Sequence, residues 1–161
     1  MAIARFEKVS LKQFENDCLK LLNKDANDYD DIKTPLRATS GSAGYDFYCP
    51  FDISIKAKET IKVPTGIRCF IENEYVLQIY PRSSLGFKYQ LGLMNTVGII
   101  DSDYYNADNE GHIIVALVNN GDKDIEIKKG DRFVQGIFVK YFLAIEEENT
   151  NERHGGFGST N

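Results

Sequence analysis

From about residue 43 onward, the chain is a succession of short runs rich in β-branched and aromatic residues. The runs are YDFY, DISI, TIKV, GIRCF, YVLQIY, VGII, HIIVALV, DIEI and RFVQGIFV. Turn-forming residues separate them, most clearly at 64–66, 119–122 and 129–131. No helical pattern intervenes, and no repeat of fixed period is present. The sequence therefore predicts an all-β, jelly-roll-like barrel.

One clear helical pattern precedes this region, at residues 10–22 with the sequence SLKQFENDCLKLL. Ser10 and Gln13 have the spacing of a capping box, and Val9 and Phe14 have that of a hydrophobic staple. The apolar side chains that fall on one face are Phe14, Cys18, Leu21 and Leu22. We expect an amphipathic helix that packs on the barrel.

The composition along the chain indicates three regions. Residues 1–33 form an N-terminal helical extension with an acidic, turn-rich linker, and residues 34–145 form the barrel core. Residues 146–161 form a charged hinge followed by a flexible, glycine-rich C-terminal arm that ends in RHGGFGSTN. A length of 161 residues with 42% hydrophobic content suits one domain with a true core.

Charge and cysteine usage exclude several classes of function. A formal net charge of -5 argues against a nucleic-acid binder that neutralises many phosphates. No apolar run approaches the roughly 18 residues that span a bilayer, and the N-terminus lacks the apolar core of a signal peptide. The cysteines Cys18, Cys49 and Cys69 contain no CxxC pair, which indicates reduced thiols. We therefore expect a cytoplasmic protein with no nucleic-acid or membrane partner.

Two stretches combine small residues with charge where a ligand could bind. In GSAGYD, Asp46 leads into an apolar strand, where a carboxylate is costly unless it is bonded; alternatively it only closes a turn. In PRSSLG, Arg82, Ser83 and Ser84 offer a guanidinium, hydroxyls and backbone N–H groups that suit phosphate. The alternative for this stretch, which follows a predicted strand, is a surface turn with an ordinary ion pair.

A third stretch, NTVGIIDSDY, runs from an apolar strand straight into acidic residues and a tyrosine. A carboxylate such as Asp101 beside a bound water can act as a general base. Asn95 carries an amide able to read the edge of a base. An acidic hairpin without chemistry is the alternative.

The fourth and fifth stretches are turns near the end of the chain. GDRFVQ presents Arg132 and Gln135 beside a predicted strand, unless it is only a turn followed by a strand. The terminal GGFGST is either a frayed end or a flap that closes over a ligand. His112 and His154 lie far apart and lack a metal-ligand pattern, so neither receives a role.

Taken in order, AGYD, PRSSLG, NTVGIIDSDY, GDRFVQ and GGFGST resemble the motifs of the trimeric dUTPases, over about residues 34–161. The resemblance implies hydrolysis of dUTP to dUMP and pyrophosphate with Mg²⁺. It implies that this reaction limits uracil incorporation into DNA and supplies dUMP for dTMP synthesis. It also implies a homotrimer in which each active site is assembled from all three subunits.

The resemblance carries roles for the third motif. Asp101 matches the residue that activates the water attacking the α-phosphorus. Tyr104 matches the ring that packs against the deoxyribose, where a ribose 2′-hydroxyl would clash. Asn95 and main-chain groups of the hairpin, including Gly98, match those that read uracil.

The remaining motifs are implied to hold the triphosphate and to close the site. Arg82, Ser83, Ser84 and Gln135 match phosphate-binding residues. Asp46 matches a carboxylate near the metal, acting through water while Mg²⁺ is held mainly by the substrate phosphates. In the arm, the residues with implied substrate contacts are Arg153 for the γ-phosphate, Phe157 for stacking on uracil, and Gly158, Ser159 and Thr160 for the phosphates.

Two departures from the family pattern stand out. The tail reads RHGGF, one residue shorter between Arg and Phe than the commonest form, and the loop after Tyr104 is longer and lacks an expected arginine. Two other functions stay open. One is a dCTP deaminase of the same fold, although no motif supplies its catalytic Glu. The other is a non-catalytic regulatory binding module, for which the helix at 10–22 is a candidate surface.

Overall fold

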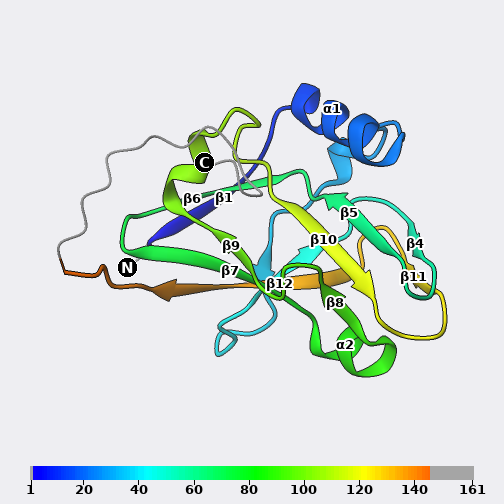
Figure 1. The fold of residues 1–161 in the computed structure, drawn as a ribbon. Coiled ribbons are helices and arrows are strands. Elements are labelled where there is room, and N and C mark those ends of the chain that lie inside the picture. The colour runs from blue at the N-terminus through cyan, green and yellow to red at the C-terminus, as the bar shows by residue number, and fades with distance from the viewer. Residues whose placement is uncertain (1, 146–161) are drawn as a thin grey trace.

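Short antiparallel strands make up most of the computed structural model, which describes residues 2–145 (Figure 1). The elements follow in the order β1 (Ala4–Lys8), α1 (Leu11–Leu22), η1 (Tyr29–Asp31), β2 (Leu36–Arg37), β3 (Tyr45–Tyr48), β4 (Ile53–Ile55), β5 (Thr60–Pro64), β6 (Ile67–Ile71), β7 (Tyr75–Pro81), α2 (Ser83–Tyr89), β8 (Leu91–Leu93), β9 (Gly98–Ile100), η2 (Ser102–Asn106), β10 (Ile114–Asn119), β11 (Ile125–Ile127) and β12 (Arg132–Lys140). The predicted all-β fold is confirmed, and each predicted run contributes a strand.

The strands pair into sheets through contacts that are mostly distant in sequence. A five-stranded sheet has the order β2-β3-β12-β7-β9, and a three-stranded sheet has the order β5-β10-β8. Two further pairs, β1-β6 and β11-β4, complete the described part of the barrel. Every pairing is antiparallel, which is the arrangement that alternating, half-buried strands favour.

Alternation of apolar and polar residues explains which side of each strand faces the core. In β4 and β11, the isoleucines are buried, while Ser54 and Glu126 between them are exposed and hydrogen-bonded to each other at 2.5 Å. The largest fully buried side chains are Phe14, Phe47, Phe51, Phe133, Ile55, Ile67, Leu77, Ile79, Ile113, Leu117, Ile125 and Ile127. Each contributes roughly 1.5–3 kcal/mol through removal of apolar surface from water.

The three cysteines belong to this core and are all free. Burial raises the pKa of the Cys18, Cys49 and Cys69 thiols to about 12. Because the thiolate is the reactive form, these residues act as small apolar side chains and carry no thiol chemistry.

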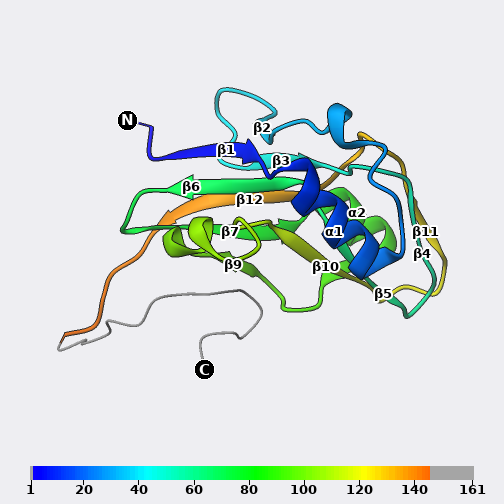
Figure 2. The same cartoon turned by 90° about the horizontal axis from the view of Figure 1, so that it is seen from above.

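Helix α1 forms where the sequence predicted it. The Ser10 hydroxyl accepts a hydrogen bond from the Gln13 N–H at 3.1 Å, which confirms the N-cap. Phe14 and Cys18 are fully buried, so α1 packs on the barrel through the predicted face. Figure 1 shows α1 and α2 on opposite sides of the strands, and Figure 2 looks down on α1 where it crosses them. No helix within residues 2–145 is long and apolar enough to cross a bilayer.

Strand β1 was not predicted, and it ties the N-terminal region to the barrel. It pairs with β6 from Ala4↔Ile71 to Lys8↔Ile67. Phe6 packs its ring against those of Tyr45, Phe47 and Phe138, with centroids 5.3 to 5.7 Å apart. The segment before α1 is therefore a part of the β-structure.

Candidate active site

A polar pocket of about 350 Å³ opens where the ends of β3, β7 and β12 meet. The sheet order β3-β12-β7 places Gln135 directly opposite Asp46 on one side and Tyr80 on the other. Arg82 follows at once after the end of β7. The pocket is lined by Ala38, Ser42, Gly44, Asp46, Arg82, Ser83, Ser84, Arg132 and Gln135. Residues from three distant motifs, predicted separately from the sequence, thus lie together.

Asp46 is 8% exposed, and two arginines balance its charge. Its Oδ1 lies 3.2 Å from Arg82 Nε, and its Oδ2 lies 3.1 Å from Arg132 Nη1. A buried carboxylate is costly unless its charge is paired in this way. Asp46 therefore holds both guanidinium groups at the pocket, which gives it a positioning role toward Arg82 and Arg132.

Arg132 received no role from the sequence, although the turn before it was singled out. The strand register shifts between Arg132 and Val134, which marks a β-bulge at the rim of the sheet. A bulge locally re-aims side chains next to a site. No pattern in the sequence reveals the partner of Arg132, because the contact with Asp46 spans 86 positions.

The stretch after β7 forms the short helix α2, which the sequence did not predict. Arg82 occupies the N-cap position with extended backbone and makes no side-chain capping bond. Its guanidinium instead reaches Asp46 and donates to the Arg132 carbonyl at 3.3 Å. Ser83 and Ser84 are exposed at the start of α2. With two arginines against one carboxylate, the pocket is cationic and suits a phosphate group.

A second, largely apolar pocket of about 250 Å³ lies beside β9 and β10. It is lined by Ile79, Leu93, Asn95, Val97, Gly98, Ile99, Ile100, Asp101, Tyr104, Ile113, Ile114, Val115 and Ala116. The four third-motif residues that the resemblance singled out are all among them. Aliphatic walls with one amide and one carboxylate suit a flat ring that carries polar groups at its edge.

The hairpin that leads into β9 is tight. Thr96 has a φ of 65°, and the Val97 N–H donates to the Asn95 carbonyl at 2.7 Å. Gly98 pairs with Ile79 of β7, and a Cβ at Gly98 would lie 3.0 Å from the Ile79 Cβ. The absence of a side chain thus lets β9 lie close to β7. Asp101 follows β9 directly and precedes η2, at the rim of the pocket.

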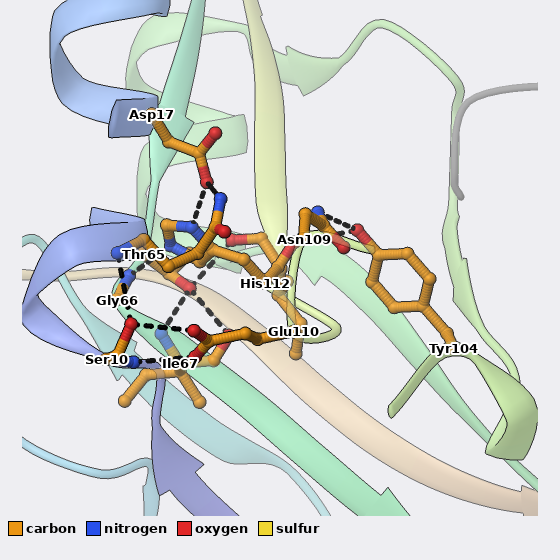
Figure 3. A network of polar contacts seen from close by, with 11 residues as sticks. Ser10, Asp17, Thr65, Gly66, Ile67, Tyr104, Asn109, Glu110 and His112 are labelled. Carbon is orange, nitrogen blue, oxygen red and sulfur yellow. Dashed lines mark hydrogen bonds and ion pairs between the residues drawn. The ribbon is translucent and has the colours of Figure 1, made fainter. Parts of the chain in front are cut away.

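Tyr104 is 6% exposed, and hydrogen bonds at its hydroxyl fix its ring (Figure 3). The hydroxyl donates to the His112 carbonyl at 2.8 Å and accepts from Asn109 Nδ2 at 2.8 Å. Both partners come from the loop that departs from the family pattern. No sequence pattern reveals these contacts, because both loop residues act through ordinary hydrogen bonds.

Gly111 offers a test of how tightly this loop is held. Its φ is +69°, and a Cβ there would lie 2.6 Å from the Tyr104 carbonyl oxygen. We expect Gly111→Ala to lower the free energy of unfolding by about 1–3 kcal/mol and to reduce nucleotide turnover. The measurements are urea unfolding and a turnover assay of the folded variant.

Gly130→Ala is the matched control, because Gly130 also has a left-handed φ of +82° but nothing lies within 4 Å of its added Cβ. It should show the cost of backbone strain without the clash. Equal loss of stability and turnover in the two variants would contradict the tight packing of residue 111 on Tyr104.

The two pockets are separate within one chain. Among the described residues, none lines both. The fifth motif, with Arg153, Phe157, Gly158, Ser159 and Thr160, lies outside the described residues. The structure therefore brings the predicted site residues together as two groups, Asp46 with Arg82, Ser83, Ser84 and Gln135, and Asn95 with Gly98, Asp101 and Tyr104.

The fold and the pockets define the class of this protein as a jelly-roll-like β-barrel with one pocket lined by arginines and one largely apolar pocket. The dUTPase family model matches residues 30–161 of the chain. The chain therefore belongs to the dUTPase family, and the resemblance seen in the five motifs is confirmed.

Relatives of known name agree with this assignment. The deoxyuridine 5'-triphosphate nucleotidohydrolase of Lactococcus lactis is 44% identical over 132 residues, covering 80% of this chain and 88% of that protein. The crystal structure of dUTPase from Streptococcus mutans aligns with a TM-score of 0.67 at 34% identity, covering 86% of this chain and 97% of that one. The dUTPase of Staphylococcus bacteriophage 80alpha shares the fold, with a TM-score of 0.67 at 18% identity, over 100% of this chain and 99% of that one.

Proposed function

We propose that this chain hydrolyses dUTP to dUMP and pyrophosphate, by attack of water on the α-phosphorus. Membership of the dUTPase family supports the reaction. The observation that carries the proposal is the gathering of Asn95, Gly98, Asp101 and Tyr104 around one apolar pocket. In a cell, the reaction would limit uracil incorporation into DNA and supply dUMP for dTMP synthesis, and we place it in the cytoplasm.

The apolar pocket would select the nucleoside. The main chain of the β9 hairpin is fixed by its tight turn and by pairing with β7, so its donors and acceptors cannot adapt to a different base edge. A cytosine would leave such groups unpaired, which discriminates strongly. The Tyr104 ring would pack on the deoxyribose, and Asp101 would accept a proton from the attacking water.

The cationic pocket would hold the triphosphate. Arg82, Ser83, Ser84 and Gln135 would donate to phosphate oxygens, with Arg82 held in place by Asp46. Arg132 lines the same pocket and would add positive charge. Binding at this pocket would orient the α-phosphorus toward Asp101.

Mg²⁺ fits this arrangement as an ion held by the nucleotide. The described residues contain no group of three or more His, Cys, Asp or Glu side chains placed to hold a metal, and both oxygens of Asp46 face arginines. Phosphate oxygens and water would therefore be the main ligands, with Asp46 acting through water. When bound, the ion would neutralise charge on the triphosphate.

Three copies of the chain would form each active site together. One line of support is that no described residue lines both pockets, so a nucleotide that uses both could take its base pocket and its phosphate pocket from different subunits. Apolar side chains after β12 are also highly exposed, at 86% for Phe142, 73% for Leu143 and 94% for Ile145. Such a patch is typical of a surface covered by another protein chain.

The C-terminal arm would close the site, and its removal gives a direct prediction. Phe157 would stack on uracil, Arg153 would reach the γ-phosphate, and Gly158, Ser159 and Thr160 would donate to the phosphates. Deletion of residues 153–161 is expected to lower kcat at least about tenfold and to leave the trimer folded. Turnover and size-exclusion chromatography with light scattering measure the two effects. Loss of the trimer would mean that the arm is structural.

A nucleotide panel tests the proposed function. Pyrophosphate release is measured with dUTP, UTP, dCTP and dTTP, each with and without Mg²⁺, and we expect rapid release from dUTP with Mg²⁺ alone. Ammonia release from dCTP without pyrophosphate release from dUTP would favour a dCTP deaminase. Binding of dUTP without turnover would favour a non-catalytic regulatory module.

A further inference from the structure

His112 is a buried, titratable residue that the reaction described above does not use. Its side chain is fully buried. The Gly66 N–H donates to His112 Nε2 at 2.8 Å, and Nδ1 lies 2.5 Å from Asp17 Oδ2 (Figure 3). Because Nε2 accepts a hydrogen bond, the ring proton resides on Nδ1 and is donated to Asp17. Gly66, together with Asp17 of helix α1, thus determines the tautomer and the orientation of His112.

The main chain of the same residue holds the nucleoside pocket in place. The His112 carbonyl accepts the hydrogen bond from the Tyr104 hydroxyl at 2.8 Å. The adjoining Ile113 N–H donates to the Ile67 carbonyl at 2.9 Å, so the chain here is fixed to the turn that carries Gly66. A continuous path of hydrogen bonds therefore runs from Asp17 through His112 to Tyr104.

A second contact ties the start of α1 to the same loop. Glu110 accepts from the Ser10 N–H at 2.8 Å and from the Ser10 hydroxyl at 2.6 Å. These hydrogen bonds lower the pKa of the Glu110 carboxyl. Glu110 thereby takes the place that Gln13 would fill in a capping box, and the Gln13 amide donates to Asp17 Oδ2 at 2.9 Å instead. Both Ser10 and Asp17 thus contact residues 110–112.

The contacts join a segment that precedes the matched family region to the loop that follows the third motif. The family model matches from residue 30 onward, so α1 lies before the matched region. The loop between Tyr104 and His112 is the part of the third motif that departs from the common pattern. Ser10 and Asp17 of the first segment contact Glu110 and His112 of the second.

We propose that Asp17 and His112 are positioning residues that place Tyr104 and thereby set the discrimination between deoxyribose and ribose nucleotides. This inference rests on the proposed function. Without Asp17, the Nδ1–H of a buried imidazole would lack its acceptor, and the ring would shift to find another. Movement of the 110–112 loop would move the Tyr104 hydroxyl and open space beside the sugar.

The test is the ratio of kcat/KM for dUTP to kcat/KM for UTP in variants of the full chain. Asp17→Ala is expected to lower this ratio about tenfold. Asp17→Asn keeps an oxygen that can accept from Nδ1–H, so it should restore most of the ratio. Glu15→Ala removes an exposed carboxylate from the same helix and should leave the ratio unchanged.

Glu110→Ala provides a second, milder variant in case Asp17→Ala does not fold, because Glu110 is only partly buried. It should lower the ratio in the same direction. An unchanged ratio in folded Asp17→Ala overturns the proposal. If Asp17→Ala does not fold, an unchanged ratio in Glu110→Ala overturns it instead. A fall of equal size in the control Glu15→Ala also overturns it. If the wild-type chain releases no pyrophosphate from dUTP, the proposed function and this inference both fail. If the wild-type chain is active and the variants leave the ratio of kcat/KM values unchanged, only this inference fails.

Discussion

Asp101→Asn is expected to lower kcat for dUTP by about 10²-fold or more while dUTP still binds. The amide has nearly the shape of the carboxylate but cannot accept a proton from water, and a positioned general base contributes about 10²–10⁴-fold. Asp101 stands between β9 and η2 at the rim of the apolar pocket, where both elements hold its backbone. The substitution therefore removes chemistry and leaves the pocket intact.

Single-turnover pyrophosphate release and calorimetric titration with a non-hydrolysable dUTP analogue separate the chemical step from binding. Asp103→Asn is the matched control, because Asp103 is an exposed carboxylate only two positions further along the chain. It should retain most of the wild-type kcat. A near wild-type kcat for Asp101→Asn, or the same loss in both variants, would contradict the role of Asp101 in water activation.

The strands and α1 could be predicted because their signals are local. The alternation in DISI and DIEI, and the Ser10 cap before an apolar helical face, depend on neighbours a few positions away. Strand β1 escaped prediction because its five residues gain their stability from pairing with β6, about sixty positions further along the chain. Helix α2 also escaped prediction because Ser83, Ser84 and Gly86 disfavour helix locally, so tertiary contacts decide its conformation.

The sequence pattern singled out residues that the fold brings together in two pockets, but it did not reveal the contacts between them. Motif order identified Asp46, Arg82 and Gln135, yet the pairing of Asp46 with two arginines follows from the register of β3 on β12. His112 lacked any metal-ligand pattern and received no role from the sequence. Its buried link from α1 to Tyr104 depends on three segments that meet only in the folded chain.

Arg82→Ala is expected to lower kcat/KM for dUTP by about 10²-fold or more. Two charge-assisted hydrogen bonds to phosphate are worth about 3 kcal/mol together, which corresponds to roughly that factor. The guanidinium also pairs with Asp46, so the variant leaves that carboxylate with Arg132 alone. Because Arg132 still pairs with Asp46 in this variant, we expect only about 1 kcal/mol loss of folding stability.

A double-mutant cycle with Asp46→Asn separates phosphate binding by Arg82 from its pairing with Asp46. Asp46→Asn removes the carboxylate charge and keeps the arginine, so its own loss of kcat/KM should be smaller and should report how far Asp46 orients Arg82. If Arg82 contacts phosphate, the double variant will be about as impaired as Arg82→Ala, because an Arg82 that is absent cannot be misplaced. If instead Arg82 matters only by neutralising Asp46, the double variant will recover most of the wild-type kcat/KM, and the assignment of this pocket to the triphosphate will fail.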